Sequence, residues 1–409
     1  MEHLLDAALA RTKLQSADRH LCQELVYGIV RWQATLDWLI DRKATSGVKQ
    51  TGLRILLQVG LYQLLWLDRV PPHAAVNETV ELARHTGFGA QSGFVNAILR
   101  GYARELDETR RLLQGLKATE PPLGYSHPGW LANRWAERWG QAQAAQLMEW
   151  NNTPPKLYAR INTLKTDAEK LLPLWREEDV EYDFVRHPWL EENLVFELKS
   201  HPSLDSLPSF NQGLFYVQDP STLLAPRELD PQPEEKTLDM CAAPGGKLTY
   251  LAQLTGNAGQ LVAYDLNPER LKQVTENCAR LGVASATANS LADLDKEGPF
   301  DRILVDAPCS NTGVIRRRVD LRWRIRPEEI ERLTRTQIEL LDQAAARVKP
   351  GGRIVYSTCS LEQEENRRVA DAFLASHPGF ELRHERELTP FTDQVDGAYV
   401  AVLIAPTKR

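Results

Sequence analysis

The sequence predicts a multidomain fold in three parts: an all-α bundle at residues 1–135, a small α+β segment at 140–228 and a Rossmann-like α/β domain at 229–409. Three patterns indicate this division. Apolar residues recur at helical spacing in the first part, and prolines and short mixed runs interrupt the second. In the third, short β-rich runs alternate with helical patterns, as in a parallel sheet with crossover helices. A chain of 409 residues also exceeds what one hydrophobic core usually organises.

Composition places the chain among ordinary globular proteins, with 43% apolar and 25% charged residues. The net charge of -6 means that any contact with nucleic acid must come from a local basic surface. No signal peptide is visible, and the longest apolar stretch, at 53–67, is too short to span a bilayer, so we expect a cytoplasmic protein. Five scattered cysteines without a C-x-x-C pair argue against a disulfide framework or a zinc module. The histidines show no ligand spacing, so no metal is expected.

The first part is expected to be helical throughout. Its helical spacing is clearest in the apolar series Leu25, Ile29, Trp32, Leu36 and Leu39. The proline pairs at 71–72 and 121–122 and the glycines at 87 and 89 separate its helices.

Four strands are expected in the third part, at residues 236–240, 259–265, 301–306 and 351–357. Each ends in a polar or small residue. In open α/β sheets, ligands bind outside the carboxyl ends of the strands. We therefore expect Asp239, Asp265, Asp306 and the run 357–360 to converge on one crevice.

The loop after the first of these strands consists of small residues and a lysine: Cys241, Ala242, Ala243, Pro244, Gly245, Gly246 and Lys247. Small residues let a ligand approach the backbone closely at a helix N-terminus. The glycine spacings of dinucleotide-binding and phosphate-binding loops are absent. Asp265 follows Gly246 by 19 residues, close to the ~20 expected for a carboxylate on ribose hydroxyls. This combination favours an adenosine-bearing ligand without a pyrophosphate, with S-adenosylmethionine as the leading candidate.

Two cysteines follow the third and fourth strands, Cys309 in DAPCSNTG and Cys359 in STCS. An isolated cysteine is more often a small buried hydrophobe, which is our interpretation of Cys22 and Cys278 on apolar helix faces. Cys309 and Cys359 lie instead among Ser, Thr and Asn at the carboxyl edge of the predicted sheet. Their position indicates a chemical role for both thiols.

The motifs DMCAAPGGK, VDAPCS and STCS, in this order, resemble those of the RNA cytosine-5 methyltransferases of the Sun/NOL family. PPKLYARINTLK and GLFYVQDPS in the middle segment are similar to that family's upstream motifs. In the first part, DRHLCQELVYGIVRWQATLD, AVNETVELAR and FVNAILR resemble the RNA-binding domain of the antitermination factor NusB. The combination covers nearly the whole chain and resembles the bacterial enzymes that methylate C5 of a cytosine in 16S rRNA.

The resemblance implies a division of chemical roles. Cytosine C5 is a poor nucleophile until a group adds at C6, and a cysteine thiolate is well suited to this addition. Cys359 is the implied nucleophile, Asp306 the implied partner of the base edge and Cys309 the implied residue for release. Lys247 is expected near the cofactor carboxylate or the target base. S-adenosylmethionine is the implied cofactor, contacted by residues 241–247, Asp265, Asp306 and, where the family often has an aspartate, Asn289.

An arginine cluster directly follows the Cys309 loop and contains Arg316, Arg317, Arg318, Arg322, Trp323, Arg324 and Arg326. Arginines with an interleaved aromatic residue can pair with phosphates and stack on unpaired bases, so this cluster is predicted to bind RNA. The glutamates at 328, 329 and 331 keep open the alternative of a solvated charged face. Methyl transfer to C5 also requires an unstacked or flipped cytosine.

We expect a monomer that acts on 16S rRNA, unassembled or partly assembled, without a membrane or a metal. Other interpretations stay open at this stage. One is a tRNA cytosine-5 methyltransferase that shares the catalytic third. Another is a non-catalytic RNA-binding assembly protein, against which both thiols and Asp306 argue. A nicotinamide oxidoreductase is disfavoured by the missing glycine fingerprint.

Overall fold

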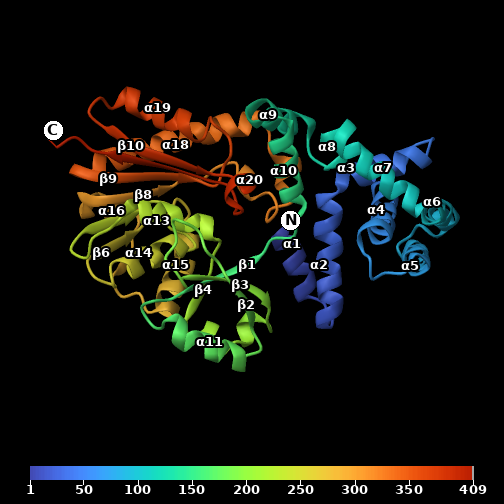
Figure 1. The fold of residues 1–409 in the computed structure, drawn as a ribbon, viewed down its shortest axis with the longest axis horizontal. Coiled ribbons are helices and arrows are strands. Elements are labelled where there is room, and N and C mark those ends of the chain that lie inside the picture. Colours follow the sequence, from blue (N-terminus) through green and yellow to red (C-terminus); the bar gives the residue numbers. More distant parts are fainter. Residues whose placement is uncertain (408–409) are drawn as a thin grey trace. The chain divides into compact units, whose positions relative to one another are not determined.

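The computed structural model describes residues 1–407 and divides the chain into two compact units (Figure 1). The first unit contains Met1–Thr153 together with Ile315–Arg324, and the second contains Pro154–Val314 together with Ile325–Arg409. The segment Ile315–Arg324 therefore belongs to the first unit, although the chain on both sides of it belongs to the second. The sequence pattern did not indicate this excursion.

The first unit is all-α, as predicted. Its core surrounds α4, in which Leu57 and Leu61 are fully buried. Pro72 stands in the first turn of α5, where the missing backbone N–H costs no hydrogen bond. The helices are α1 (Glu2–Ala10), α2 (Ser16–Arg31), α3 (Gln33–Lys43), α4 (Thr51–Trp66), α5 (Pro72–His85), α6 (Ser92–Arg104), α7 (Leu106–Thr119), α8 (Pro121–Gly124), α9 (Gly129–Trp139), α10 (Gln141–Asn152) and, from the inserted segment, α17 (Leu321–Arg324).

The middle segment forms an antiparallel sheet of four strands in the order β2-β3-β1-β4. Trp175 of α11 fills its core, with Phe196 and Phe215 packed edge-on at ring-centroid distances of 5.7 and 5.3 Å. The elements are β1 (Leu157–Ile161), α11 (Ala168–Glu177), β2 (Glu181–Phe184), β3 (Val195–Ser200), α12 (Pro208–Asn211), β4 (Phe215–Val217) and α13 (Leu224–Leu229). The predicted α+β character of the segment is confirmed.

A sheet of seven strands follows, in the order β10-β11-β9-β8-β5-β6-β7. Strands β5 to β9 are parallel, and β11 and β10 add an antiparallel edge. Its strands are β5 (Lys236–Asp239), β6 (Gln260–Ala263), β7 (Ala286–Ala288), β8 (Phe300–Asp306), β9 (Val348–Thr358), β10 (Glu381–Leu388) and β11 (Ala398–Ile404). Its helices are α14 (Gly246–Leu254), α15 (Pro268–Leu281), α16 (Leu291–Glu297), α18 (Pro327–Arg347), α19 (Arg367–Ser376) and α20 (Pro390–Asp393). The four predicted strands are β5, β6, β8 and β9.

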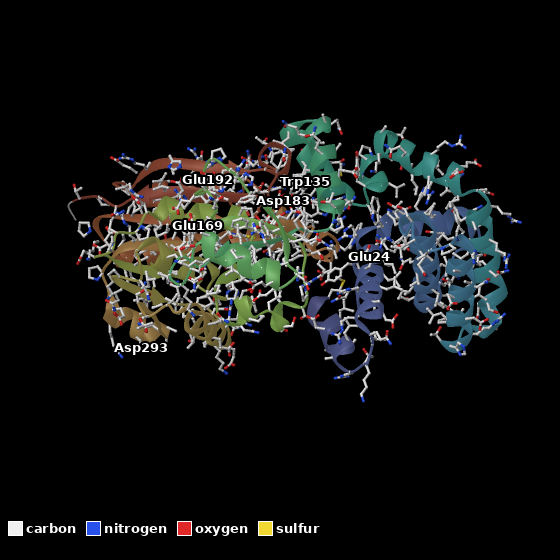
Figure 2. All side chains as sticks on the ribbon, turned by 60° about the horizontal axis from the view of Figure 1, so that its bottom comes forward. Glu24, Trp135, Glu169, Asp183, Glu192 and Asp293 are labelled. Atoms are coloured by element: carbon white, nitrogen blue, oxygen red, sulfur yellow. The ribbon has the colours of Figure 1, made fainter. Side chains whose placement is uncertain are left out.

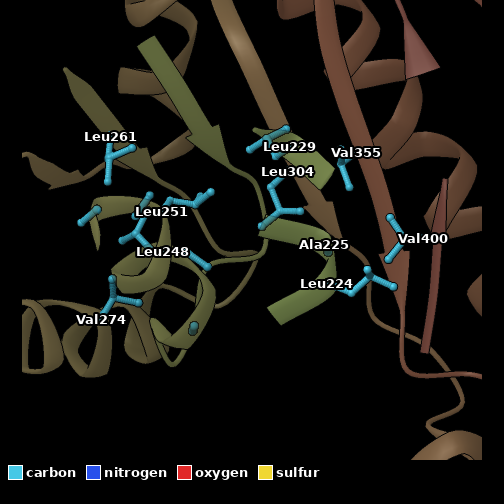
Figure 3. Close-up of a cluster of buried hydrophobic side chains, with 14 of the residues drawn as sticks. Leu224, Ala225, Leu229, Leu248, Leu251, Leu261, Val274, Leu304, Val355 and Val400 are labelled. Carbon is cyan, nitrogen blue, oxygen red and sulfur yellow. The ribbon is translucent and has the colours of Figure 1, made fainter. Parts of the chain in front are cut away.

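Helices cover both faces of this sheet, because alternate residues of a strand point to opposite sides. Leu304 and Val355 pack with α13 and α14 on one face, where Leu248 and Leu251 are fully buried (Figure 3). The neighbouring residues of the same strands pack with α18 and α19 on the other face (Figure 1). Burial on both faces explains the short apolar runs LVA, ILV and IVY in β6, β8 and β9.

The surface of the second unit carries many exposed acids, including Glu169, Asp183, Glu192 and Asp293 (Figure 2). Within residues 1–407, no helix combines the length and the apolar composition needed to cross a membrane.

Candidate active site

The carboxyl ends of four parallel strands bring together most of the predicted site residues. β8 lies between β5 and β9, with Asp239 paired to Leu304 and Asp306 paired to Ser357 in the strand register. β6 ends beside β5 at Ala263, and Asp265 lies two residues further along the chain. The ends of these strands and the segments that follow them carry the lysine, the carboxylates and the two thiols, as expected for an open α/β sheet.

The conformation of the loop 241–246 is held by a glycine at its end and by a carboxylate beside it. Gly245 adopts φ +106°, a conformation that favours glycine, and caps the start of α14. The Asp265 carboxylate accepts the backbone N–H of Ala243 at 3.1 Å and that of Asn267 at 2.9 Å. Asp265 is only 4% exposed, so this carboxylate shapes the loop as well as the ligand pocket.

A pocket of about 450 Å³ opens beside this loop, at the ends of β6 and β7. Its wall is formed by Tyr264, Asp265, Leu266, Pro268, Leu271, Lys272, Thr275, Ala288, Asn289 and Ser290. Apolar walls with a single carboxylate suit a nucleoside. The side chain of Asn289 reaches the pocket wall and donates to Glu297 at 3.1 Å. The residues present therefore fit the adenosine moiety of S-adenosylmethionine.

Lys247 and Asp306 form an ion pair at the centre of the edge, with Nζ 2.5 Å from Oδ2. Ser357 donates its hydroxyl to Oδ1 of the same carboxylate at 2.8 Å. Burial alone would lower the pKa of Lys247, but the attraction of Asp306 outweighs it and the pKa is raised. The ammonium group therefore stays charged at neutral pH. Asp306 and Ser357 lie at the ends of β8 and β9, and Cys309 and Cys359 follow in the loops after these two strands, so the ion pair and the thiols belong to one site.

The two predicted cysteines face each other, with their sulfur atoms 3.4 Å apart. Cys359 is half-buried and Cys309 is buried, so Cys359 is the more accessible thiol. The hydrogen bond to Cys359 and burial together raise the pKa of Cys309 well above that of an ordinary thiol. Cys309 is therefore a protonated thiol at neutral pH, which suits it poorly as the nucleophile.

Asn311 contacts both cysteines, and the sequence reasoning did not single it out. Its Oδ1 accepts the thiol hydrogen of Cys359 at 3.1 Å, and its Nδ2 donates to the carbonyl oxygen of Cys309 at 2.6 Å. The second bond fixes the amide orientation, so the oxygen must face Cys359. Its position two residues after Cys309, in a polar loop, was the available signal.

The arginine cluster is split by the structure. Arg322 is fully buried and donates to the carbonyl oxygens of Arg31, Ser126 and Asn151 and to the side chain of Asn152. Arg316 is 2% exposed and lies 4.0 Å from the ring centroid of Trp150. Burial corrects the expectation that these two arginines face RNA.

The other members of the cluster keep some surface. Trp323 is half-buried and donates its indole N–H to the carbonyl of Val30 at 2.7 Å. Arg318 and Arg324 are exposed, and Arg317 is half-buried. Over residues 1–407, no group of three or more His, Cys, Asp and Glu side chains could hold a metal ion.

Comparison with known proteins gives matches along most of the chain. The profile of the 16S rRNA methyltransferase RsmB/F family matches residues 226–408, and that of the NusB family matches residues 1–104. A ferredoxin-like domain of RsmF/B-like methyltransferases matches residues 127–200.

Curated relatives match over almost the full length. The "Probable ribosomal RNA small subunit methyltransferase B" of Synechocystis sp. is 39% identical over 91% of this chain and 84% of the relative. The "Ribosomal RNA small subunit methyltransferase B" of Klebsiella pneumoniae is 36% identical over 96% of this chain and 91% of the relative.

Two solved structures are similar as well. PH0851 has a TM-score of 0.77 at 27% identity, and the match covers 97% of this chain and 93% of the PH0851 chain. A methyltransferase homolog from Pyrococcus horikoshii has a TM-score of 0.60 at 32% identity and covers 69% of this chain and 97% of its own.

The fold, the pocket and these matches define the class of this protein as a methyltransferase that depends on S-adenosylmethionine. Its particular place follows from the full-length relatives. The chain belongs to the family of ribosomal RNA small subunit methyltransferase B.

Proposed function

We propose that this protein methylates C5 of a cytosine in 16S rRNA through a covalent bond between Cys359 and C6 of the base. The observation that carries the proposal is the pair of thiols 3.4 Å apart, in one site with Asp306 and Lys247. The names of the relatives support the ribosomal small subunit as the source of the substrate.

The first chemical step belongs to Cys359, the more accessible sulfur. As its thiolate bonds to C6, the C5–C6 double bond opens and its electron pair makes C5 nucleophilic. Asp306 is positioned to bind the base edge, and Lys247 offsets the charge that gathers there. Asn311 holds the Cys359 thiol in place before the attack. When bound in the pocket beside Asp265, S-adenosylmethionine supplies the methyl group.

Release requires the proton on C5 to leave. Its bonding electrons then rebuild the C5–C6 double bond, and the sulfur–C6 bond breaks to return the Cys359 thiolate. We assign Cys309 to this step, because it is the ionisable side chain that contacts the Cys359 sulfur directly. Cys309 holds its own proton in the free enzyme, so it must first release that proton to water before its thiolate can accept the C5 proton.

RNA is held, in this proposal, by the helical unit and by the exposed arginines of the 315–324 segment. Arg318 and Arg324 offer guanidinium groups for phosphate contacts. The target cytosine must unstack from its neighbours before its C6 can reach the Cys359 sulfur and its C5 can reach the methyl group.

Two alanine variants and one control test the proposal. Cys359→Ala should lose C5 methylation of 16S rRNA, read by bisulfite sequencing, while it still binds the cofactor. Cys309→Ala should accumulate a protein–RNA adduct that survives denaturant, because attack proceeds without release. Cys22→Ala, which changes a half-buried cysteine of the helical unit, should behave as wild type. Full activity in Cys359→Ala would refute the nucleophile assignment, and loss of a tRNA mark alone would refute the substrate assignment.

A further inference from the structure

Glu365 is a buried acid just before α19, between the Cys359 loop and that helix. Its exposed fraction is 0%, so no part of the side chain reaches solvent. Burial raises the pKa of this carboxyl group, and the hydrogen bonds that it accepts oppose the effect. A buried carboxyl group destabilises the folded protein unless its oxygens accept hydrogen bonds from the surrounding groups.

Those oxygens connect the two cysteine loops. Oε1 accepts the backbone N–H of Ser310, the residue after Cys309, at 2.7 Å. Oε2 accepts the hydroxyl of Ser360, the residue after Cys359, at 2.5 Å, and also the hydroxyl of Ser310. One side chain therefore bridges the immediate neighbours of both thiols.

Helix α18 joins the same network. The amide of Gln337 donates to Oε1 of Glu365 at 3.2 Å and to the carbonyl oxygen of Pro308 at 2.9 Å. The hydroxyls of Ser310 and Ser360 also lie 3.1 Å apart. The carboxyl group of Glu365 thus forms one polar link between the loops after β8 and β9.

We propose that Glu365 is a positioning residue that sets the distance between the Cys309 and Cys359 sulfurs. The proposal rests on the function given above, in which one sulfur attacks and the other completes release. Removal of the carboxyl group removes one of the links between the two loops, so the separation of the sulfurs is less tightly fixed. Attack by Cys359 alone tolerates this change better than release, which needs both sulfurs on one base.

The separation can be measured without RNA. Glutathione disulfide oxidises the two thiols of the full-length protein to a Cys309–Cys359 disulfide and yields two molecules of glutathione. The rate of ring closure, divided by the alkylation rate of Cys359 with iodoacetamide, reports how often the two sulfurs meet. In Glu365→Ala this ratio should fall on the order of tenfold or more, because closure depends on preset geometry. Glu364→Ala is the matched control, since Glu364 pairs with Arg368 instead and should leave the ratio unchanged.

The second measurement uses RNA. Glu365→Ala should raise the share of protein found as a denaturant-resistant adduct during turnover, while methylation slows. A purely structural role would lower adduct and product together. Unchanged closure and unchanged adduct in Glu365→Ala would overturn the proposal.

A milder variant keeps the test decisive if Glu365→Ala does not fold. Ser360→Ala removes the hydroxyl through which Glu365 reaches the Cys359 loop, together with its contacts to Ser310 and Thr312, and its closure ratio should fall in the same direction. An unchanged ratio in folded Ser360→Ala would then overturn the proposal. Failure of the proposed function gives a different result from failure of the Glu365 proposal. If the proposed function fails, wild-type protein would form neither adduct nor 5-methylcytosine, while the ratio of ring closure to alkylation would still fall in Glu365→Ala.

Discussion

At the scale of one residue, the buried carboxyl group of Asp239 has a pKa that its surroundings raise. The side chain is 1% exposed, and its Oδ2 has no hydrogen-bond partner within residues 1–407. Burial, and then the neighbouring charge of Asp306, raise the pKa of Asp239 to about 7. A carboxyl group with a raised pKa is more stable in its protonated form in the folded protein.

Stability should therefore depend on pH through Asp239. Between about pH 4 and pH 7, the unfolded chain releases a proton that folded Asp239 retains, so the free energy of unfolding falls as pH rises. Asp239→Asn removes this dependence. At about 1.4 kcal/mol per unit of pKa, the variant should exceed wild type by a few kcal/mol at pH 8 and by little at pH 4. Urea denaturation at both pH values measures the difference, and an equal gain at both would contradict this account.

Sequence reasoning found the site residues that stand in recognisable motifs. Cys309, Cys359, Lys247 and Asp306 follow strands, so their convergence could be predicted from strand order. Asn311 and Glu365 could not be assigned roles, since their importance lies in hydrogen bonds across two loops. The burial of Arg322 could not be predicted from the sequence either, because the backbone carbonyls that it binds lie far away along the chain.

At the scale of elements, the β8 and β9 loops touch through backbone as well as through Glu365. Gly313 donates its N–H to the carbonyl oxygen of Cys359 at 2.9 Å, and its own carbonyl accepts the N–H of Gly397 at 2.9 Å. A Cβ at position 313 would lie 2.7 Å from the oxygens of both Cys359 and Gly397. Backbone atoms cannot yield to such a contact as a side chain can.

Gly313→Ala should therefore displace the segment directly after β9, which carries Cys359. We expect methylation to fall on the order of 100-fold, the usual cost of a misplacement of about 1 Å. Cofactor affinity should change little, because the pocket lies at β6 and β7. Gly115→Ala, which meets no atom within 4 Å, is the control. Single-turnover methylation and cofactor titration provide the two readouts, and an equal loss in both would refute the local explanation.

The elements themselves were predictable where their patterns are strong. β6, β8 and β9 contain the short apolar runs LVA, ILV and IVY, and β5 is short but mostly buried. β7 has only three residues, and two of them are exposed, so it leaves no strand signal. β10 is an edge strand whose residues are mostly charged, and pairing with β11 rather than its own pattern makes it a strand.

At the scale of the whole molecule, the chain links its two units more than once. It leaves the second unit after Val314, contributes Ile315–Arg324 to the first, and returns at Ile325. Arg322 and Trp323 join this segment to the helical unit through hydrogen bonds to backbone carbonyls. The segment that directly follows the Cys309 loop is thus part of the fold of the helical unit.

Arg322→Met should destabilise the helical unit, because several carbonyl oxygens would lose a buried donor. The expected loss is about 1–3 kcal/mol for the unsatisfied groups. Arg324→Met is the control, since Arg324 is 72% exposed and pairs with Asp320 near the surface, where an ion pair contributes little. Amide hydrogen exchange across α2 and α10 should accelerate in the first variant alone. Equal protection in both would show that the segment does not support the unit.

The central claim is that Cys359 bonds to the cytosine ring, and one measurement tests it most directly. A 16S rRNA fragment with 5-fluorocytidine in place of cytidine carries fluorine where a proton must leave, so release stops after methyl transfer. Digestion and mass spectrometry of the trapped complex should find the nucleotide on the peptide that contains Cys359. A nucleotide on Cys309, or methylated product without any trapped protein, would contradict the account.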